Sequence, residues 1–258
     1  MSYRLLFLGD VVGRPGRDAL QRELPRLIQQ WEPLFIVVNG ENAAGGVGIT
    51  GEIAASMFAL GVHAITLGNH AFNKREVFPY LNGSAAIIRP ANMPPGNPGR
   101  GSVEVTNDGI TLYIANLCGR VFMDTYDDPF RAIDSMLEDV TTPHRLIDFH
   151  AEATSEKIAM AWHLDGRATA VLGTHTHVPT ADERILPGGT AAITDVGMTG
   201  PYESVLGMNK DVVLGRFKTG MPTRFEVAET IGVISGVVLD VERLTGRATA
   251  IKRVRSDG

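Results

Sequence analysis

The sequence predicts an α/β protein whose parallel strands carry a polar site at their carboxyl ends. Short apolar runs alternate with segments of helical periodicity, which is typical of βαβ crossovers and a parallel sheet. Several of these runs end in glycine or directly in carboxylate, amide or imidazole side chains. Ligands of open α/β sheets bind outside the carboxyl ends of the strands. We therefore expect the polar residues to meet at one edge of one parallel sheet.

The composition is that of a globular chain with a large core. The 258 residues are 44% hydrophobic and 21% charged, which suits a single domain over residues 1–258 and argues against disorder. The net charge of −5 argues against a broad basic surface for duplex nucleic acid. It does not argue against a small anionic substrate, because bound metal ions can reverse the local sign of the charge.

A cytoplasmic protein without a membrane partner is the expectation from cysteine usage and from the first strand. The single cysteine, Cys118, excludes an intramolecular disulfide and a zinc–thiolate cluster, and it fits a reducing compartment. The apolar run Tyr3–Leu8 is too short for a signal sequence or a membrane span.

The first third of the chain repeats the order strand, polar turn, helix. The expected strands are Tyr3–Leu8, Leu34–Val38 and Ala64–Leu67. Helical spacing of apolar residues predicts a helix over Asp18–Trp31, which Pro25 is expected to kink or split. Thr50 is expected to cap the next helix.

The rest of the chain is expected to contain two hairpins, further strands and two helices. The hairpins cover Val103–Asn116, which turns at Asn107-Asp108-Gly109, and Ile231–Glu242 with Thr249–Val254. The strands are Leu146–Phe149, Ala168–Leu172 and Thr190–Thr194. The helices are Asp128–Leu137, with Pro129 in its first turn, and Ser155–Leu164.

The most specific local signal is the pair of histidines in Gly173-Thr174-His175-Thr176-His177. The pair directly follows a buried apolar run. Residues two apart at a strand end point the same way if the backbone stays extended. Two imidazoles placed in this way can converge on metal.

Metal-competent side chains follow five of the expected strands. The set consists of Asp10, Glu41, Asn42, Asn69, His70, His150, His175 and His177. It contains no thiolate, so it suits manganese, iron or zinc. A mononuclear site needs three or four protein ligands, and the larger number here is enough for two ions that share a bridging carboxylate. Paired ions about 3.5–4 Å apart are a recurring device for in-line displacement at phosphorus.

Each member of this set also has a structural explanation when it is taken alone. Asp10 could cap the following helix, Glu41 and Asn42 could form an exposed turn, and Asn69 could be a left-handed turn residue. The histidines could be structural, as we expect for three that do not end an apolar strand: His63, His144 and His163. Five strands that all end in metal-competent residues favour a shared site.

The motifs resemble those of the calcineurin-like metallophosphoesterases, and in particular of their YmdB-like branch. The strings that carry the resemblance are Gly68-Asn69-His70, Gly173-Thr174-His175-Thr176-His177, Leu8-Gly9-Asp10-Val11-Val12-Gly13-Arg14-Pro15-Gly16, Asn39-Gly40-Glu41-Asn42-Ala43-Ala44-Gly45-Gly46 and Thr194-Asp195-Val196-Gly197-Met198-Thr199-Gly200. The general superfamily has histidine at Val12 and aspartate at Glu41, and the YmdB-like branch resembles this chain at both. The resemblance implies a layered α/β/β/α sandwich.

The resemblance also implies roles for the site residues. One ion would be held by Asp10, Asn42 and His177, and the other by Asn69, His150 and His175. Glu41 would bridge the two ions, which would be iron or manganese, with zinc as a further option. His70 would stay off the metals and protonate the leaving oxygen. After Asn69-His70 the branch often has Thr-Trp-Asp where this chain has Ala71-Phe72-Asn73.

The implied activity is a phosphodiesterase for 2′,3′-cyclic nucleotides that associates into dimers or higher oligomers. The expected reaction is in-line attack by a hydroxide that two ions share, with a histidine as general acid. Two alternatives remain, a dinuclear hydrolase of another bond and a metal-dependent regulatory protein with little turnover. A nucleotide-binding loop is disfavoured because Gly13-x-x-Gly16 lacks the lysine and spacing of a P-loop.

Three further features have two readings each. The glycines from Gly45 to Gly51 could form a lip over the substrate or a surface loop that needs positive φ. Arg14 and Arg17 could meet phosphate or be solvated. Asp195 could orient a ligand histidine or cap a turn, and the sequence slightly favours the turn.

Overall fold

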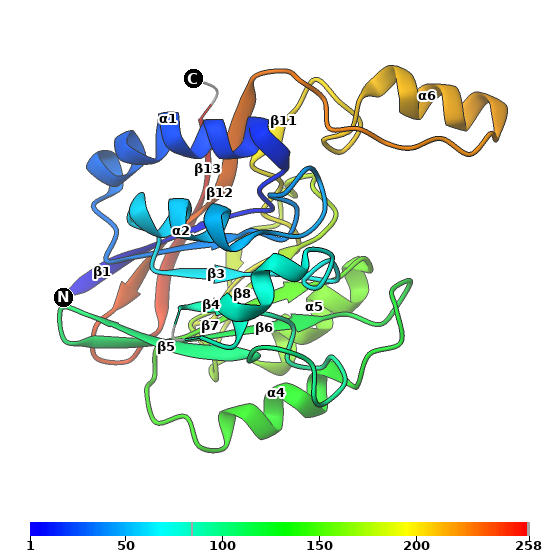
Figure 1. Ribbon diagram of the computed structural model, residues 1–258. Helices are drawn as coiled ribbons and strands as arrows, with labels where there is room; N and C mark the ends of the chain where they lie inside the picture. The colour runs from blue at the N-terminus through cyan, green and yellow to red at the C-terminus, as the bar shows by residue number, and fades with distance from the viewer. Residues whose placement is uncertain (84, 257–258) are drawn as a thin grey trace.

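Two β-sheets pack face to face, and helices cover the outer face of each sheet (Figure 1). The computed structural model describes residues 1–83 and 85–256. The layers run helix, sheet, sheet, helix, so the layered fold is confirmed. The expectation of one parallel sheet is wrong. The apolar strands need cover on both faces, and here each sheet receives it from a helical layer on one side and from the other sheet on the other side.

The first sheet has the strand order β11-β12-β1-β2-β3-β4, and β13 pairs with β12. Its strands are β1 (Ser2–Leu8), β2 (Phe35–Asn39), β3 (Ala64–Thr66), β4 (Ile87–Ile88), β11 (Gly200–Pro201), β12 (Gly232–Glu242) and β13 (Ala248–Ser256). Strands β1 to β4 are parallel, whereas β12 runs antiparallel to β1. The predicted closing hairpin is β12 with β13 and is confirmed.

The second sheet has the strand order β5-β6-β7-β8-β10-β9. Its strands are β5 (Ser102–Asn107), β6 (Ile110–Cys118), β7 (Arg145–His150), β8 (Ala170–Thr174), β9 (Arg184–Ile185) and β10 (Ala191–Ile193). Strands β6, β7, β8 and β10 are parallel. The β5–β6 hairpin is confirmed, and its turn residues Asp108 and Gly109 both have positive φ, as a tight hairpin turn requires.

The helices are α1 (Gly13–Trp31), α2 (Gly51–Ala59), η1 (Arg75–Val77), α3 (Phe78–Leu81), α4 (Pro129–Leu137), α5 (Thr154–His163) and α6 (Lys210–Thr219). None of the described helices is long and apolar enough to cross a membrane. The expected cap of α2 is confirmed, because Thr50 Oγ1 accepts a hydrogen bond from the Ile53 amide at 3.3 Å.

Helix α1 begins at Gly13, and the prediction of a start at Asp18 is wrong. Pro15 lies in its first turn, where a proline removes no internal hydrogen bond. Pro25 does not split the helix. The carbonyl that loses its donor belongs to Gln21, an exposed residue on the solvent side, where water can take the place of the missing amide.

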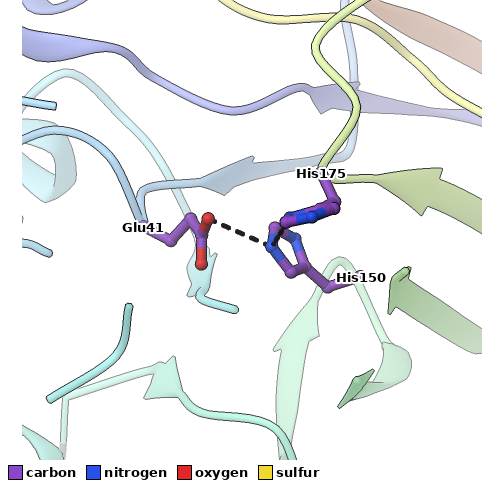
Figure 2. Close-up of side chains that lie close together, drawn as sticks. All are labelled: Glu41, His150 and His175. Carbon is purple, nitrogen blue, oxygen red and sulfur yellow. Dashed lines mark hydrogen bonds and ion pairs between the residues drawn. The ribbon is translucent and has the colours of Figure 1, made fainter. Parts of the chain in front are cut away.

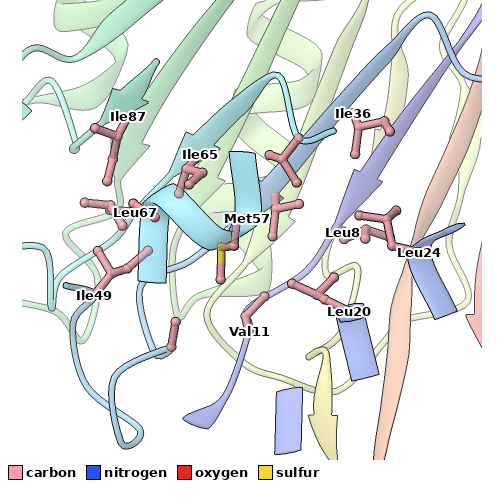
Figure 3. Close-up of a cluster of buried hydrophobic side chains, with 14 of the residues drawn as sticks. Leu8, Val11, Leu20, Leu24, Ile36, Ile49, Met57, Ile65, Leu67 and Ile87 are labelled. Atoms are coloured by element: carbon pink, nitrogen blue, oxygen red, sulfur yellow. The ribbon is translucent and has the colours of Figure 1, made fainter. Parts of the chain in front are cut away.

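Apolar side chains fill the space between each pair of layers. Leu8, Leu20, Leu24, Ile36 and Met57 belong to the cluster between the first sheet and its helices (Figure 3). A second cluster lies between the sheets, and a third lies between the second sheet and its helices. These three cores fix the two sheets against each other and so fix the ends of their strands.

Helix α6 projects from the body of the molecule on two long connections (Figure 1). The sequence did not predict this helix. Its buried position is Val213, while Leu214 and Phe217 are exposed. An amphipathic pattern records burial against a core, and a helix that packs on so little core leaves no such pattern.

Candidate functional site

The eight predicted site residues lie at the carboxyl ends of five strands, three in the first sheet and two in the second. Asp10 does not cap α1, because the cap position is Val12 and makes no side-chain hydrogen bond. Glu41 and Asn42 are buried, so they do not form an exposed turn. Asn69 does not have a positive φ. The site therefore lies where the ends of the two sheets meet.

One group of donor atoms surrounds His150, which is fully buried. Its Nε2 atom lies 3.0 Å from Glu41 Oε1, 3.0 Å from Asn69 Oδ1 and 3.0 Å from His175 Nδ1. The ligand atoms of Glu41, His150 and His175 all lie within 4.8 Å of one another (Figure 2). Four side chains from both sheets thus point their nitrogen or oxygen atoms at one small volume.

A hydrogen-bond chain determines which nitrogen of His150 faces this volume. The Thr174 hydroxyl donates to Asp148 Oδ1 at 2.7 Å, so its proton is not available for a second hydrogen bond. His150 Nδ1 lies 2.8 Å from the same hydroxyl oxygen and therefore donates to it. In the neutral imidazole the Nε2 lone pair then points at Glu41 and Asn69, which also present lone pairs. A cation placed among these atoms would bind their lone pairs.

Glu152 orients His175 in a similar way, although the sequence analysis missed this residue. His175 Nε2 lies 3.3 Å from Glu152 Oε2, which turns Nδ1 toward His150. Carboxylates that bond the outer nitrogen of a ligand histidine are common around metals. The sequence feature that could have identified Glu152 is its position two residues after a histidine at the end of a strand.

A second group of donor atoms consists of Asp10, Asn42 and His177. His177 Nε2 lies 3.2 Å from Asn42 Oδ1 and 4.0 Å from Asp10 Oδ2. His177 Nδ1 donates to the Leu206 carbonyl, and the Asn42 amide nitrogen donates to the Gly46 carbonyl. The remaining lone pairs therefore face one another. Within residues 1–83 and 85–256, the buried Asp10 Oδ1 has no hydrogen-bond partner.

The two histidines of the His-x-His pair belong to different donor groups. The backbone between them does not stay extended, since His175 has φ 96° and His177 has φ 64°. The His175 amide donates to Asp10 Oδ2 at 3.0 Å, and the Thr176 amide donates to Asp195 Oδ2 at 3.0 Å. These bonds hold a backbone that non-glycine residues rarely adopt and aim each imidazole into its own group.

Asp195 closes the turn that follows it and also holds the residue between the two histidines. Its Oδ1 accepts from the Gly197 amide at 2.8 Å and so closes the following turn. Its Oδ2 accepts from the Thr176 amide and hydroxyl and pairs with Lys157 Nζ at 2.9 Å. Asp195 therefore touches the residue between the two histidines and neither histidine itself.

Burial and neighbouring charges shift the pKa values of four site residues. Burial raises the pKa of Asp10 to about 6. Burial would also raise the pKa of Glu41, but the His150 imidazole outweighs it and lowers the value to about 2. Burial lowers the pKa of His175 to about 3, whereas Glu41 and Asp10 overcome burial at His150 and raise its pKa to about 9. Without a bound cation, these shifts favour a proton on His150, which then occupies the place beside Glu41 that a cation would take.

Together these observations show that the residues fit divalent cations. The donors are oxygen and imidazole nitrogen, they converge on two small volumes, and the buried Asp10 Oδ1 accepts no hydrogen bond among the described residues, its neighbour being His150 Nδ1 at 3.8 Å. Gly68 is required for this packing. A Cβ atom at that position would lie 2.1 Å from Glu41 Oε2 and 2.4 Å from His150 Nε2.

Four of the donor residues, Glu41, Asn42, His175 and His177, line a cleft of about 790 Å³. His70 lines this cleft, and its amide donates to Glu41 Oε2 at 3.2 Å. Gly46 lines the cleft and has φ 91°, so the glycine loop both needs positive φ and borders the site. The other walls are mainly apolar, with Glu152, Thr176 and Arg216 as polar members, and come in part from the projecting α6 segment.

The remaining candidates lie elsewhere. Arg17 donates to the Ala43 carbonyl and so braces the loop after Glu41, while the exposed Arg14 pairs with Asp18. Three histidines have partners away from the donor groups, as predicted: His63 with the Ile36 amide, His144 with Tyr3 and His163 with Asp134.

Comparison with known proteins identifies the family. A model of the YmdB-like protein family matches residues 6–254. The chain belongs to the YmdB-like family. A 2′,3′-cyclic-nucleotide 2′-phosphodiesterase of Bacillus subtilis strain 168 is 51% identical over 253 residues, which cover 97% of this chain and 96% of that protein. The family expected from the sequence motifs is therefore confirmed.

Solved structures of similar proteins have the same fold. A hypothetical protein from Thermus thermophilus has a TM-score of 0.93 and 43% identity, with 98% of this chain and 99% of that chain covered. A novel phosphatase from Mycoplasma pneumoniae has a TM-score of 0.94 and 34% identity, with 99% of this chain and 94% of that chain covered. These two proteins thus share the fold of this chain along nearly their whole length.

Proposed function

We propose that this YmdB-like protein is a metal-dependent phosphodiesterase that hydrolyses 2′,3′-cyclic nucleotides. The observation that carries the proposal is the presence of two groups of donor atoms beside one cleft, which Glu41, Asn42, His175 and His177 line. The name of the Bacillus subtilis relative supports both the substrate class and the reaction type.

The ligand sets of the proposal follow the two donor groups. Asp10, Asn42 and His177 would hold one ion, and Asn69, His150 and His175 would hold the other. Glu41 would bridge the ions, which agrees with its contact to His150 and with its effect on the charge of Asp10. Bound divalent ions would supply Lewis acidity, which lowers the pKa of water and neutralises phosphoryl charge. We propose iron or manganese, with zinc as a further option.

We propose His70 as the proton donor, and its surroundings support this role. Its backbone is tied to Glu41 Oε2, while its side chain faces the cleft. Its Nε2 lies 3.4 Å from the amide nitrogen of Asn69, on the side of Asn69 that does not face His150. We infer that His70 protonates the alkoxide oxygen that leaves phosphorus and binds no metal.

The proposal includes a homo-oligomer and a cytoplasmic location. A buried thiol at Cys118 fits a reducing compartment. Light scattering after size exclusion measures the mass of the assembly, and a monomer at micromolar concentration would contradict the oligomer.

Metal removal and reloading test the function. Chelated protein should not hydrolyse 2′,3′-cyclic AMP, and addition of Mn²⁺, Fe²⁺ or Zn²⁺ should restore hydrolysis with one product isomer. Elemental analysis of freshly purified protein should give two ions per chain. Hydrolysis that survives chelation would contradict metal dependence. Two bound ions without turnover would favour the regulatory alternative, and cleavage of an amide substrate instead would favour another hydrolase.

A further inference from the structure

The cleft above the donor groups continues along the projecting α6 segment. Its lining includes Phe217, which is 80% exposed, and Phe225, which is 40% exposed. Both aromatic rings therefore border the same cavity as His70 and His175 while they remain open to solvent. Exposed phenylalanines next to a polar site are costly to leave in water, and they often mark a binding surface.

The side chains of this surface form one wall of the cavity. Val213 and Phe217 are four residues apart on α6, so they lie on the same side of the helix and both line the cavity. The Arg216 guanidinium lies over the Phe225 ring, 5.0 Å from its centroid. Leu206 and Met208 extend the apolar wall toward His177, whose Nδ1 atom donates to the Leu206 carbonyl.

We propose that this wall, formed by Phe217, Phe225, Arg216 and Leu206, binds the nucleobase of the substrate. The proposal rests on the function proposed above. Substrate phosphate would lie at the donor groups, and the base would lie flat against the aromatic side chains. A cavity of about 790 Å³ is within the usual range for sites that enclose a small molecule, roughly 300–1,000 Å³. The wall offers π-faces and a guanidinium, which are suited to stacking.

Stacking has a consequence for specificity. Every base has a π-face, so an aromatic wall binds the four bases with similar strength. Arg216 is engaged with Phe225, and the other members of the wall carry no polar side-chain atoms that could read the edge of a base. We therefore expect little discrimination among cyclic nucleotides and a strong preference for any of them over a cyclic phosphate of ribose that has no base.

The test compares two substrates and two variants. The substrates are 2′,3′-cyclic AMP and 1-O-methyl-ribose 2,3-cyclic phosphate, which share the phosphodiester and differ in the base. Phe217→Ala should raise KM for the nucleotide about tenfold, since one base–aromatic stack has roughly this effect. It should leave kinetics on the base-free substrate unchanged. Leu214→Ala, on the same helix but outside the cavity lining, should change neither substrate.

Binding provides a readout that does not depend on turnover. Calorimetry on the metal-loaded protein should show weaker binding of 3′-AMP to Phe217→Ala, with binding of ribose 3-phosphate unchanged. Wild-type protein that binds 3′-AMP in this way but hydrolyses neither substrate would contradict the proposed function and leave the base site supported.

Two outcomes would overturn the base site. An equal loss on both substrates would mean that Phe217 supports the site without contacting the base. A change of sedimenting mass in Phe217→Ala, with unchanged KM for the nucleotide, would mean that the wall contacts a second copy of the chain.

Discussion

The Asp195 carboxylate holds Thr176 with two hydrogen bonds to one oxygen, at 3.0 Å from the amide and 2.6 Å from the hydroxyl. Thr176 separates His175 and His177, which both have positive φ. Such a conformation costs about 1–3 kcal/mol per residue and persists only when its surroundings impose it. Asp195 and its buried partner Lys157 are therefore part of what places the two imidazoles in separate donor groups.

Substitution Asp195→Asn should destabilise the protein because it leaves Lys157 buried without a counter-charge. Removal of one partner from a buried ion pair typically costs about 3–5 kcal/mol. Urea unfolding of chelated protein measures this loss as a lower midpoint. The double variant Lys157→Met with Asp195→Asn should lose less stability than Asp195→Asn alone. Equal losses in the two variants would show that the buried charge is not the cause.

The family motifs predicted the layers correctly, and the apolar pattern placed the buried strands. Each of Tyr3–Leu8, Leu34–Val38 and Ala168–Leu172 coincides with a strand to within about two residues. The pattern did not reveal that two sheets are present. A strand that is buried on both faces has the same run of apolar residues whichever of the two sheets it belongs to. Short elements such as β4 and β11 were also not predicted, because a strand of two residues is too short to show a hydrophobic pattern.

The sequence predicted which residues form the site better than it predicted their geometry. Strand ends led to all eight candidates, and the structure brings them together. The sequence did not reveal the positive φ of His175, because only the bonds from Asp10 and Asp195, distant in the chain, impose it. Glu152 was missed because its partner, His175, comes from another strand, so the contact is visible only in the folded chain.

Gly68→Ala should damage the site although it adds a single methyl group. The new Cβ atom would lie 2.1 Å from Glu41 Oε2, so Glu41 and His150 must move apart. We expect a loss of about 1–3 kcal/mol in stability, typical of overpacking, and loss of bound metal by elemental analysis.

Gly215→Ala is the matched control, because no atom of residues 1–83 and 85–256 lies within 4 Å of a Cβ atom there and the residue is inside α6. It should keep its metal and gain about 0.5–1 kcal/mol from better helix propensity. Full metal content in Gly68→Ala would contradict the close packing that the structure shows around Glu41.

Glu41→Ala should release both ions, because Glu41 is the carboxylate proposed to join the two donor groups. The change removes an oxygen 3.0 Å from His150 Nε2 and the negative charge that acts on Asp10. Elemental analysis should fall from two ions per chain to none, with loss of turnover. Glu52→Ala changes an exposed glutamate at the start of α2 and should retain two ions. A Glu41→Ala protein that still binds both ions would remove the bridging role.

His70→Ala should slow the reaction without removing metal. Loss of a general acid should lower kcat by about 10²–10⁴-fold on 2′,3′-cyclic AMP, whose leaving group is an alkoxide. The loss should be much smaller on bis(p-nitrophenyl) phosphate, because p-nitrophenolate leaves without being protonated. His163→Ala, whose imidazole contacts Asp134 away from the cleft, should leave both substrates unaffected. If His70→Ala lost an ion, or slowed both substrates equally, His70 would be a ligand or a structural residue and the proton would come from another group.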